Sequence, residues 1–187
     1  MRIISGKFKG RNLVSFKASH IRPTMDRVKE TLFNKWMHDV DECRFLDLFS
    51  GTGNLGIEAL SRGASHITFV EKNIKSIQIL KENIQLLKIE NSEYDIYTKD
   101  VIAFLKGYTG SPFQLIVIDP PFTEKMAHDV MVAIDQSKVF DENTKIAIEA
   151  IKQERIDADY ENLTCYDKLD YGDKSLSFFC KKQQNES

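Results

Sequence analysis

The sequence has few cysteines and no long apolar run, and both absences restrict what the protein can be. Its three cysteines are odd in number and widely spaced, with no CxxC pair, which argues against a disulfide framework or a zinc site. The four histidines show no ligand spacing, so no metal is expected. No stretch of 18 apolar residues is present, and the first ten residues lack the apolar core of a signal peptide. We therefore expect a soluble, cytoplasmic protein with reduced thiols and no membrane partner, most simply a monomer.

Charge is distributed unevenly along the chain. The formal net charge is only −2, yet residues 1–40 carry nine Lys or Arg against three Asp or Glu, so the rest of the chain is acidic. A basic segment beside a mildly acidic body predicts a localised surface that binds a polyanion such as nucleic acid. The length of 187 residues, with 42% hydrophobic and 29% charged residues, suits one globular domain with a small extension.

From residue 45 onward, short apolar runs alternate with helical periodicity. The expected strands are 45–49, 67–70, 94–98 and 115–118. A helix starting at Asn73 is expected to place Ile74, Ile77, Ile84 and Leu87 on one face, and another helix is expected over 124–135. Strands that alternate with helix-length crossovers predict an α/β fold with a doubly wound, mostly parallel sheet.

The two ends of the chain differ from this alternating pattern. Residues 2–14 predict a short hairpin, and from Thr24 the periodicity becomes helical, with Trp36 at a core position. At the other end, three further strands are expected over 145–150, 163–169 and 175–180. The turn over 170–174 joins the last two of them, so this closing hairpin is expected to supply an antiparallel strand.

The segment DLFSGTGNLG, residues 47–56, contains a GxGxxG pattern directly after an expected strand and at the start of a helix. Glycines here allow the backbone to turn tightly and to approach a ligand closely. Glu71 ends the next strand, where a carboxylate can hydrogen-bond both hydroxyls of a ribose. Strand context and spacing together predict a nucleoside-binding crevice at the carboxyl ends of the strands.

Two aspartates bear on which nucleoside cofactor binds there. A dinucleotide oxidoreductase would use the same glycines to hold a pyrophosphate, so NAD remains an alternative. Asp47, however, stands where it could accept hydrogen bonds from a cationic amino group, which suits the methionine part of S-adenosylmethionine better than a phosphate. Asp100, after the weaker strand, could accept from the adenine amino group.

The tetrapeptide DPPF, residues 119–122, follows the expected strand 115–118 and so lies on the same rim as the glycine loop. Two prolines stiffen the chain and lack N–H groups, so Asp119 and the Pro120 carbonyl can both accept hydrogen bonds from one –NH₂ group. An exocyclic base amine is a poor nucleophile, because its lone pair is delocalised into the ring, and two acceptors localise that lone pair. Phe122 offers a face on which a base can stack.

With both motifs in place, the chain resembles the bacterial 16S ribosomal RNA guanine-N2 methyltransferases called RsmD. The resemblance covers nearly the whole chain, in the segments RIISGKFKGRNL, RPTMDRVKETLFN, DLFSGTGNLGIEALSRGA, FVEK, IDPPF and YGDKSLSFF. It implies a seven-stranded Rossmann-like methyltransferase fold, S-adenosylmethionine as cofactor and 16S ribosomal RNA, or the assembling small subunit, as partner. Phe49 stands where many methyltransferases outside this group carry glycine, a departure that agrees with the subfamily.

The resemblance also implies a division of the chain and a set of site residues. We expect a basic RNA-binding extension over residues 1–40 that borders the cofactor pocket, a catalytic domain over 41–182 and a frayed tail over 183–187. The expected catalytic residues are Asp119, Pro120, Pro121 and Phe122. The expected cofactor-binding residues are Arg22, Thr24, Asp47, Ser50, Gly51, Thr52, Gly53, Glu71, Lys72, Asp100 and Val101.

Three other functions remain open from the sequence. Because the same tetrapeptide serves adenine-N6 enzymes, an adenine-N6 methyltransferase acting on DNA or RNA is the nearest. An NAD-dependent oxidoreductase and a non-catalytic RNA-binding factor are the others. Glu58 and Glu149 are interpreted as a helix-surface residue and a strand-end residue, not as catalytic acids.

Overall fold

The computed structural model describes residues 1–16, 23–122 and 126–183, with backbone but not side chains for 23–25. Its helices are α1 (Pro23–Lys35), α2 (Asn54–Ser61), α3 (Ile74–Leu87), the short 3-10 helix η1 (Asn91–Glu93), α4 (Val101–Gly107) and α5 (Ala127–Asp135). Its strands are β1 (Arg44–Leu48), β2 (His66–Val70), β3 (Tyr94–Tyr97), β4 (Leu115–Ile118), β5 (Lys145–Ile151), β6 (Leu163–Tyr171) and β7 (Lys174–Lys181).

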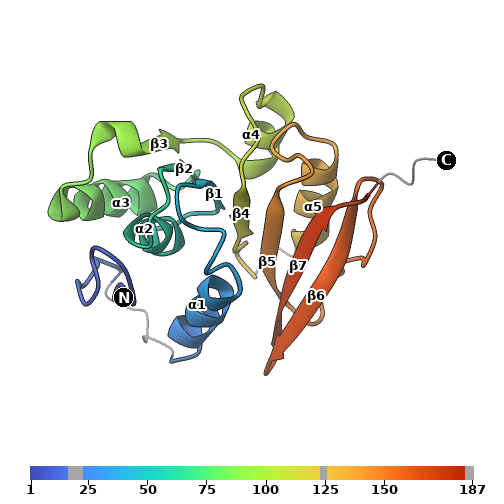
Figure 1. Ribbon diagram of the computed structural model, residues 1–187, viewed down its shortest axis with the longest axis horizontal. Helices are drawn as coiled ribbons and strands as arrows, with labels where there is room; N and C mark the ends of the chain where they lie inside the picture. The colour runs from blue at the N-terminus through green and yellow to red at the C-terminus, as the bar shows by residue number, and fades with distance from the viewer. Residues whose placement is uncertain (17–22, 123–125, 184–187) are drawn as a thin grey trace.

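The described strands form one seven-stranded sheet in the order β3-β2-β1-β4-β5-β7-β6 (Figure 1). The first five strands in that order are parallel, and β7 pairs antiparallel with both β5 and β6. This confirms the expected Rossmann-like sheet with an antiparallel C-terminal hairpin. The strand order reverses between β1 and β4, and open α/β sheets bind ligands in the crevice outside the carboxyl ends of the strands at such a point.

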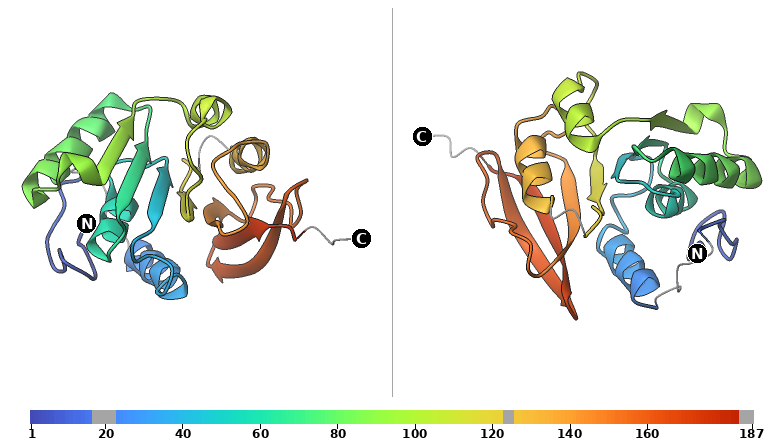
Figure 2. Two further views of the ribbon diagram at one scale, coloured as in Figure 1. Left: turned by 45° about the horizontal axis from the view of Figure 1, so that its top comes forward. Right: turned by 180° about the vertical axis from the view of Figure 1, so that it is seen from behind.

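Each face of the sheet is covered by its own layer of helices (Figure 2). Side chains alternate between the faces, so Phe45 and Val117 pack with residues of α1, α2 and α3, whereas Leu46 and Ile118 pack with residues of α4 and α5. Trp36 is fully buried on the first of these faces, as the periodicity predicts. The same alternation turns Asp47 toward the α1 side, because it is two residues from Phe45.

Most expected elements are confirmed to within a residue or two, with three differences. α4 was not predicted as a separate helix, because its seven residues offer a short apolar pattern. Ile74 is 57% exposed, so its expected place on the buried face of α3 is wrong. The expected helix over 124–135 begins at Ala127, and residues 123–125 lie outside the described part of the chain.

The N-terminal hairpin is shorter than expected. It contains one isolated antiparallel bridge between Arg2 and Asn12, supported by a 3.0 Å hydrogen bond from the Ile3 N–H to the Arg11 carbonyl. The side chains of Ile3 and Leu13 nevertheless enter the core on the α1 face. None of the helices in the described ranges combines the length and apolarity that crossing a bilayer requires.

Candidate active site

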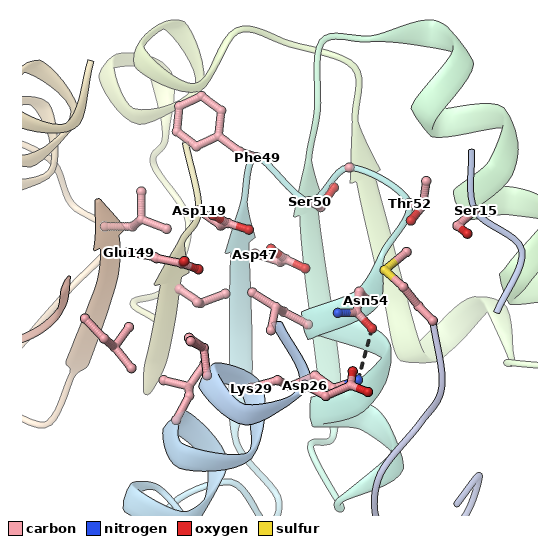
Figure 3. A pocket seen from close by; sticks show the side chains of 18 of the residues that line it. Ser15, Asp26, Lys29, Asp47, Phe49, Ser50, Thr52, Asn54, Asp119 and Glu149 are labelled. Carbon is pink, nitrogen blue, oxygen red and sulfur yellow. Dashed lines mark hydrogen bonds between the residues drawn. The ribbon is translucent and has the colours of Figure 1, made fainter. Parts of the chain in front are cut away.

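A cavity of about 280 Å³ opens at the carboxyl ends of β1 and β4, on the α1 face of the sheet (Figure 3). Three parts of the chain line it: the glycine loop after β1, the ends of β4 and β5, and the N-terminal segment with α1. The polar and charged residues of the lining are Ser15, Asp26, Lys29, Asp47, Ser50, Thr52, Asn54, Asp119 and Glu149. The two predicted motifs therefore meet at one cavity.

The loop after β1 turns through a series of left-handed backbone conformations. Gly51 and Gly53 have φ values of 53° and 89°, which glycine adopts at little cost. A Cβ on Gly53 would lie 2.4 Å from a methyl group of Leu80, so this position also requires the absence of a side chain. Phe49 has a φ of 64°, which is uncommon for a bulky residue and which glycine would adopt at less cost. The strained turn directs the loop over the cavity.

Asp47 lies on β1 beneath this loop and is almost fully buried, at 1% exposure. Its Oδ2 accepts a 2.8 Å hydrogen bond from the Gly56 N–H in the first turn of α2. The pKa of Asp47 is raised to about 8, mainly by burial and also by the negative charges of Asp119 and Glu71, against the lowering effect of that hydrogen bond. Among the residues that the structure describes, no cation pairs with this buried carboxyl group.

Glu71 connects the end of β2 to the glycine loop. Its Oε2 accepts a 2.9 Å hydrogen bond from the Gly51 N–H, and its Oε1 accepts a 2.7 Å hydrogen bond from the Asn73 N–H. Each carboxylate oxygen has a second lone pair, so both oxygens retain the capacity to accept from another donor. The carboxylate therefore fixes the loop and keeps acceptors available beside it.

Asp119 directly follows β4 and is half-buried at the rim of the cavity. The pKa of Asp119 is raised to about 7, mainly by loss of solvation and also by the negative charge of Glu149, against the lowering effect of the positive charge of Lys174. A carboxyl group with a pKa near neutrality can exist in either protonation state under physiological conditions. Such a group at a cavity rim is a candidate for proton transfer.

Lys174 connects Glu149 to the tetrapeptide 119–122. Its Nζ lies 2.7 Å from Oε1 of Glu149 and 3.7 Å from the centre of the Phe122 ring. The ammonium–ring contact is a cation–π interaction, which holds one face of the ring. Any base that stacks on Phe122 must therefore use the other face.

Acidic groups outnumber basic groups among the described residues that line the cavity. Four carboxylates line it, those of Asp26, Asp47, Asp119 and Glu149, against the single ammonium of Lys29 among the described lining residues. That ammonium is already 3.1 Å from Glu58 and donates a hydrogen bond to Asn54. An anionic pyrophosphate would be repelled here, whereas a cationic ligand would be attracted.

Ser50 supplies a second indication that a ligand belongs in the cavity. Its side chain is buried, at 7% exposure, and its Oγ has no hydrogen-bond partner in the described part of the protein. A buried polar group without a partner is costly, so such groups normally find one. Because Ser50 lines the cavity, a bound molecule can supply that partner.

Glu58 was expected on the surface of its helix, and this expectation is wrong. Its side chain is fully buried, and its two oxygens contact Lys29 at 3.1 Å and Arg62 at 2.8 Å. The same oxygens accept hydrogen bonds from the Ile4 and Ser5 N–H groups at 2.9 and 3.1 Å. Glu58 thus anchors the N-terminal segment to α2, next to the glycine loop.

The expected site residues fall into two groups in the structure. Asp47, Ser50, Gly51, Thr52 and Asp119 line the cavity. Outside that lining lie Gly53, Glu71, Lys72, Asp100, Val101, Pro120, Pro121 and Phe122.

Two residues of the second group lie apart from the cavity for clear reasons. Asp100 caps α4 by accepting from the Ile102 and Ala103 N–H groups, and Val101 is buried on the opposite face of the sheet. Arg22 lies outside the described residues, and Thr24 is described only as backbone within α1. Within the described ranges, His, Cys, Asp and Glu form no group of three that could hold a metal ion.

Several lining residues were missed by the sequence analysis. Asp26 and Lys29 reach the cavity from α1, and Asn54 reaches it from the first turn of α2. Glu149 was interpreted only as a strand-end residue, although it lies beside Asp119. In the sequence Glu149 is only a charged residue between Ile148 and Ala150 near the end of the expected strand 145–150, which does not show that it faces Asp119.

Comparisons with known proteins agree with this geometry. The family model described as Conserved hypothetical protein 95 matches residues 1–180. A Haemophilus influenzae relative named ribosomal RNA small subunit methyltransferase D is 37% identical over 153 residues, covering 81% of this chain and 79% of the relative. A Bacillus subtilis relative, provisionally named rRNA methyltransferase YlbH, is 36% identical and covers 97% of this chain and 100% of its own length. A solved Escherichia coli structure, provisionally named methyltransferase yhhF, has a TM-score of 0.85 at 26% identity, covering 98% of this chain and 99% of its own.

Proposed function

The chain belongs to the Conserved hypothetical protein 95 family, which is the family of ribosomal RNA small subunit methyltransferase D, and we propose that it methylates small-subunit ribosomal RNA with S-adenosylmethionine. The finer proposal is that the methyl group goes to the exocyclic N2 amine of a guanine. Both proposals are supported by one observation: the glycine loop and Asp119 line the same cavity, which is rich in carboxylates.

The residues present fit S-adenosylmethionine. The cofactor carries a positive sulfur and an ammonium group, which the excess of carboxylates in the cavity would stabilise. The Ser50 hydroxyl would gain the hydrogen-bond partner that it lacks among the residues that the structure describes. Glu71 would accept from the ribose hydroxyls while it continues to hold the loop. NAD, with its anionic pyrophosphate, fits this charge distribution poorly.

The chemistry requires alignment and two hydrogen-bond acceptors. Asp119 and the Pro120 carbonyl accept from the amine and direct its lone pair out of conjugation with the base. When bound, S-adenosylmethionine would supply an electrophilic methyl group, with which the amine lone pair could form an N–C bond while the electron pair of the broken C–S bond remained on sulfur. The amine then loses one proton, for which Asp119, with its pKa of about 7, is a suitable acceptor before water. Alignment of this kind can contribute about 7–11 kcal/mol to the lowering of the barrier.

The N-terminal segment is the proposed RNA-binding surface. Residues 1–40 form the basic extension, and Lys7, Lys9 and Arg11 are exposed on its loop. These cations would bind phosphates, so affinity for RNA should fall steeply with salt. Because a base edge in a stack is inaccessible, the target guanine would be extruded into the cavity. The site of action would be the cytoplasm, with the protein as a monomer on 16S ribosomal RNA or an assembling small subunit.

The decisive experiment is methylation in vitro with isotope-labelled S-adenosylmethionine. The purified protein is incubated with 16S ribosomal RNA, and with small subunits, from cells that lack the enzyme. The methylated nucleoside is then identified by mass spectrometry and mapped to a position. We expect N2-methylguanosine at one position. N6-methyladenosine would support the nearest alternative instead, and the absence of methylation in every substrate would contradict the proposal.

A further inference from the structure

Glu149 and Asp119 occupy equivalent positions on neighbouring parallel strands. β4 and β5 pair in a register that places Ile118 opposite Ile148, so the next residues on the two strands are Asp119 and Glu149. Neighbouring strands are about 4.8 Å apart, and side chains at paired positions of parallel strands point to the same face. Both carboxylates line the cavity, and Figure 3 shows them side by side at its rim.

Glu149 is held in place with one oxygen still available. Its Oε1 pairs with Lys174 at 2.7 Å, and the two side chains are only 17% and 16% exposed. Across the described residues its other oxygen, Oε2, accepts no hydrogen bond. Lys174 also contacts the Phe122 ring, so the ion pair fixes the position of Glu149 relative to the catalytic tetrapeptide. A half-buried carboxylate that presents a free acceptor to a cavity favours a ligand with a donor at that point.

Guanine and adenine differ in the ring atom next to the exocyclic amine. In guanine the atom next to the reactive N2 amine is N1, which carries a hydrogen and donates. In adenine the atom next to the N6 amine is also N1, but it carries a lone pair and accepts. An ionised carboxylate can only accept, so it forms a hydrogen bond with the guanine edge and repels the lone pair of the adenine edge.

We propose that Glu149 selects guanine: its carboxylate accepts the N1–H of the extruded base while Asp119 accepts from the adjacent N2 amine. This inference rests on the proposed function and names the residue that determines its base specificity. Lys174 is then a positioning residue, since it acts by holding Glu149. The two neighbouring carboxylates match the two neighbouring donors that guanine presents and adenine lacks.

The test compares guanine with 2-aminopurine, which keeps the N2 amine but has a lone pair in place of the N1–H. Two substrates are made by RNA ligation, with either base at the mapped position, in the form that the wild-type protein methylates. We expect the wild type to prefer guanine by about 100-fold or more in kcat/KM, because sites that hydrogen-bond a substrate reject analogues that lack the group. In Glu149→Gln the side-chain amide can donate to N1 of 2-aminopurine. The preference for guanine over 2-aminopurine in kcat/KM should therefore fall at least about tenfold.

Lys174→Met is the matched control, since it removes the ion pair but keeps the Glu149 acceptor. We expect it to lower methylation of both substrates by a similar factor and to leave the preference within about threefold of wild type. Calorimetric titration with S-adenosylhomocysteine establishes that each variant is folded. An equal loss on both substrates in Glu149→Gln, with the preference unchanged, would overturn the proposal, as would a wild type that methylates both substrates equally well. Failure of the wild type to methylate either substrate would instead contradict the proposed function.

Discussion

The protein contains two clusters of buried charge that lie close together and differ in how they are neutralised. In the first, Glu58 contacts Lys29 and Arg62 and accepts two backbone N–H groups, so both carboxylate oxygens are fully used. In the second, around the cavity, Asp47 has one backbone partner and no cationic partner among the described residues, and its pKa is raised to about 8. The carboxylate of the first cluster is fully paired within the protein, whereas that of Asp47 has no opposite charge in the described part of the chain.

This difference indicates which cluster stabilises the fold and which one binds a ligand. A buried carboxylate whose partners are all in the protein stabilises one arrangement of the chain, here the attachment of the N-terminal segment to α2. A group of buried carboxylates with too few cations is a ligand site, because a cationic ligand removes the cost of keeping them there. Sequence position does not distinguish the two, since each cluster contains acidic residues within or beside apolar segments.

The largest expected effect comes from Asp119→Ala, which removes a carboxylate of the second cluster. We expect methyl transfer in single-turnover assays to fall by about 10²–10⁴-fold, the usual range for loss of a group that handles a proton. Removing a carboxylate whose pKa is raised by burial should not lower the thermal unfolding temperature. Glu142→Ala, at an exposed position, serves as the control and should leave the rate unchanged. Full activity of Asp119→Ala would mean that the rim of the cavity is not where chemistry occurs.

Glu58→Ala should also have a large effect, but on the stability of the folded protein and not on the chemical step. Removal of one partner leaves Lys29 buried at 1% exposure without its carboxylate, which typically costs about 3–5 kcal/mol in the free energy of unfolding. Chemical denaturation monitored by circular dichroism measures this change. A loss of less than about 1 kcal/mol would show that the first cluster is not the structural anchor that its contacts indicate.

The third prediction concerns pH and the second cluster. Asp47 and Asp119 have pKa values raised to about 8 and 7, so both are partly protonated in the empty protein at pH 7. A bound cation favours their ionised forms, so S-adenosylmethionine should displace protons, and its affinity should rise with pH between 5.5 and 7 by up to about tenfold per unit for each proton released. Calorimetry in buffers of different ionisation enthalpy measures the protons directly.

The same raised pKa values determine whether the stability of the folded protein rises or falls with pH. The folded state binds these protons more tightly than the unfolded state, so the contribution of Asp47 and Asp119 to stability is complete below about pH 4 and is lost as pH rises through about 7 and 8. Asp47→Asn should reduce both the proton release and this loss of stability. If the cofactor affinity were constant from pH 5.5 to 7, cofactor binding would not be linked to the protonation of the second cluster. The two clusters would then not differ in the way proposed.

The smallest effect is expected from Ser50→Ala. Because its hydroxyl has no hydrogen-bond partner among the described residues, the free energy of unfolding of the empty protein should stay the same or increase slightly. Cofactor affinity should fall by about three- to tenfold, the value of one ordinary hydrogen bond. Equilibrium titration together with denaturant unfolding tests both parts. A loss of stability without a loss of affinity would place the hydroxyl among the structural groups.

The fold could be predicted largely from the sequence because its strands are encoded locally. The apolar run 115–118 predicts β4 to the residue, since it is short, rich in β-branched residues and bounded by the polar residues Gln114 and Asp119. The N-cap Asn73 predicts where α3 begins, and its side chain accepts from the Lys75 and Ser76 N–H groups. α4 could not be predicted in the same way, because seven residues span only two helical turns.

The residues of the candidate site that belong to sequence motifs could be predicted, whereas those whose positions depend on tertiary contacts could not. The glycine loop and Asp119 were placed from local context, and the structure brings them together. Glu58 was misplaced, because one of its partners, Lys29, is far away in sequence and belongs to another helix. Glu149 depends on the register of β5 against β4, which is fixed by packing across the sheet and cannot be read from either strand alone.

The attachment of the N-terminal segment has a consequence for synthesis of the protein. The Ile4 and Ser5 N–H groups find their acceptor 54 and 53 residues later in the chain, on Glu58. Residues 4 and 5 are made before Glu58, so their N–H groups have no native acceptor until α2 has been synthesised. In a nascent chain halted before residue 58, the N-terminal segment would therefore lack the carboxylate that attaches it to α2.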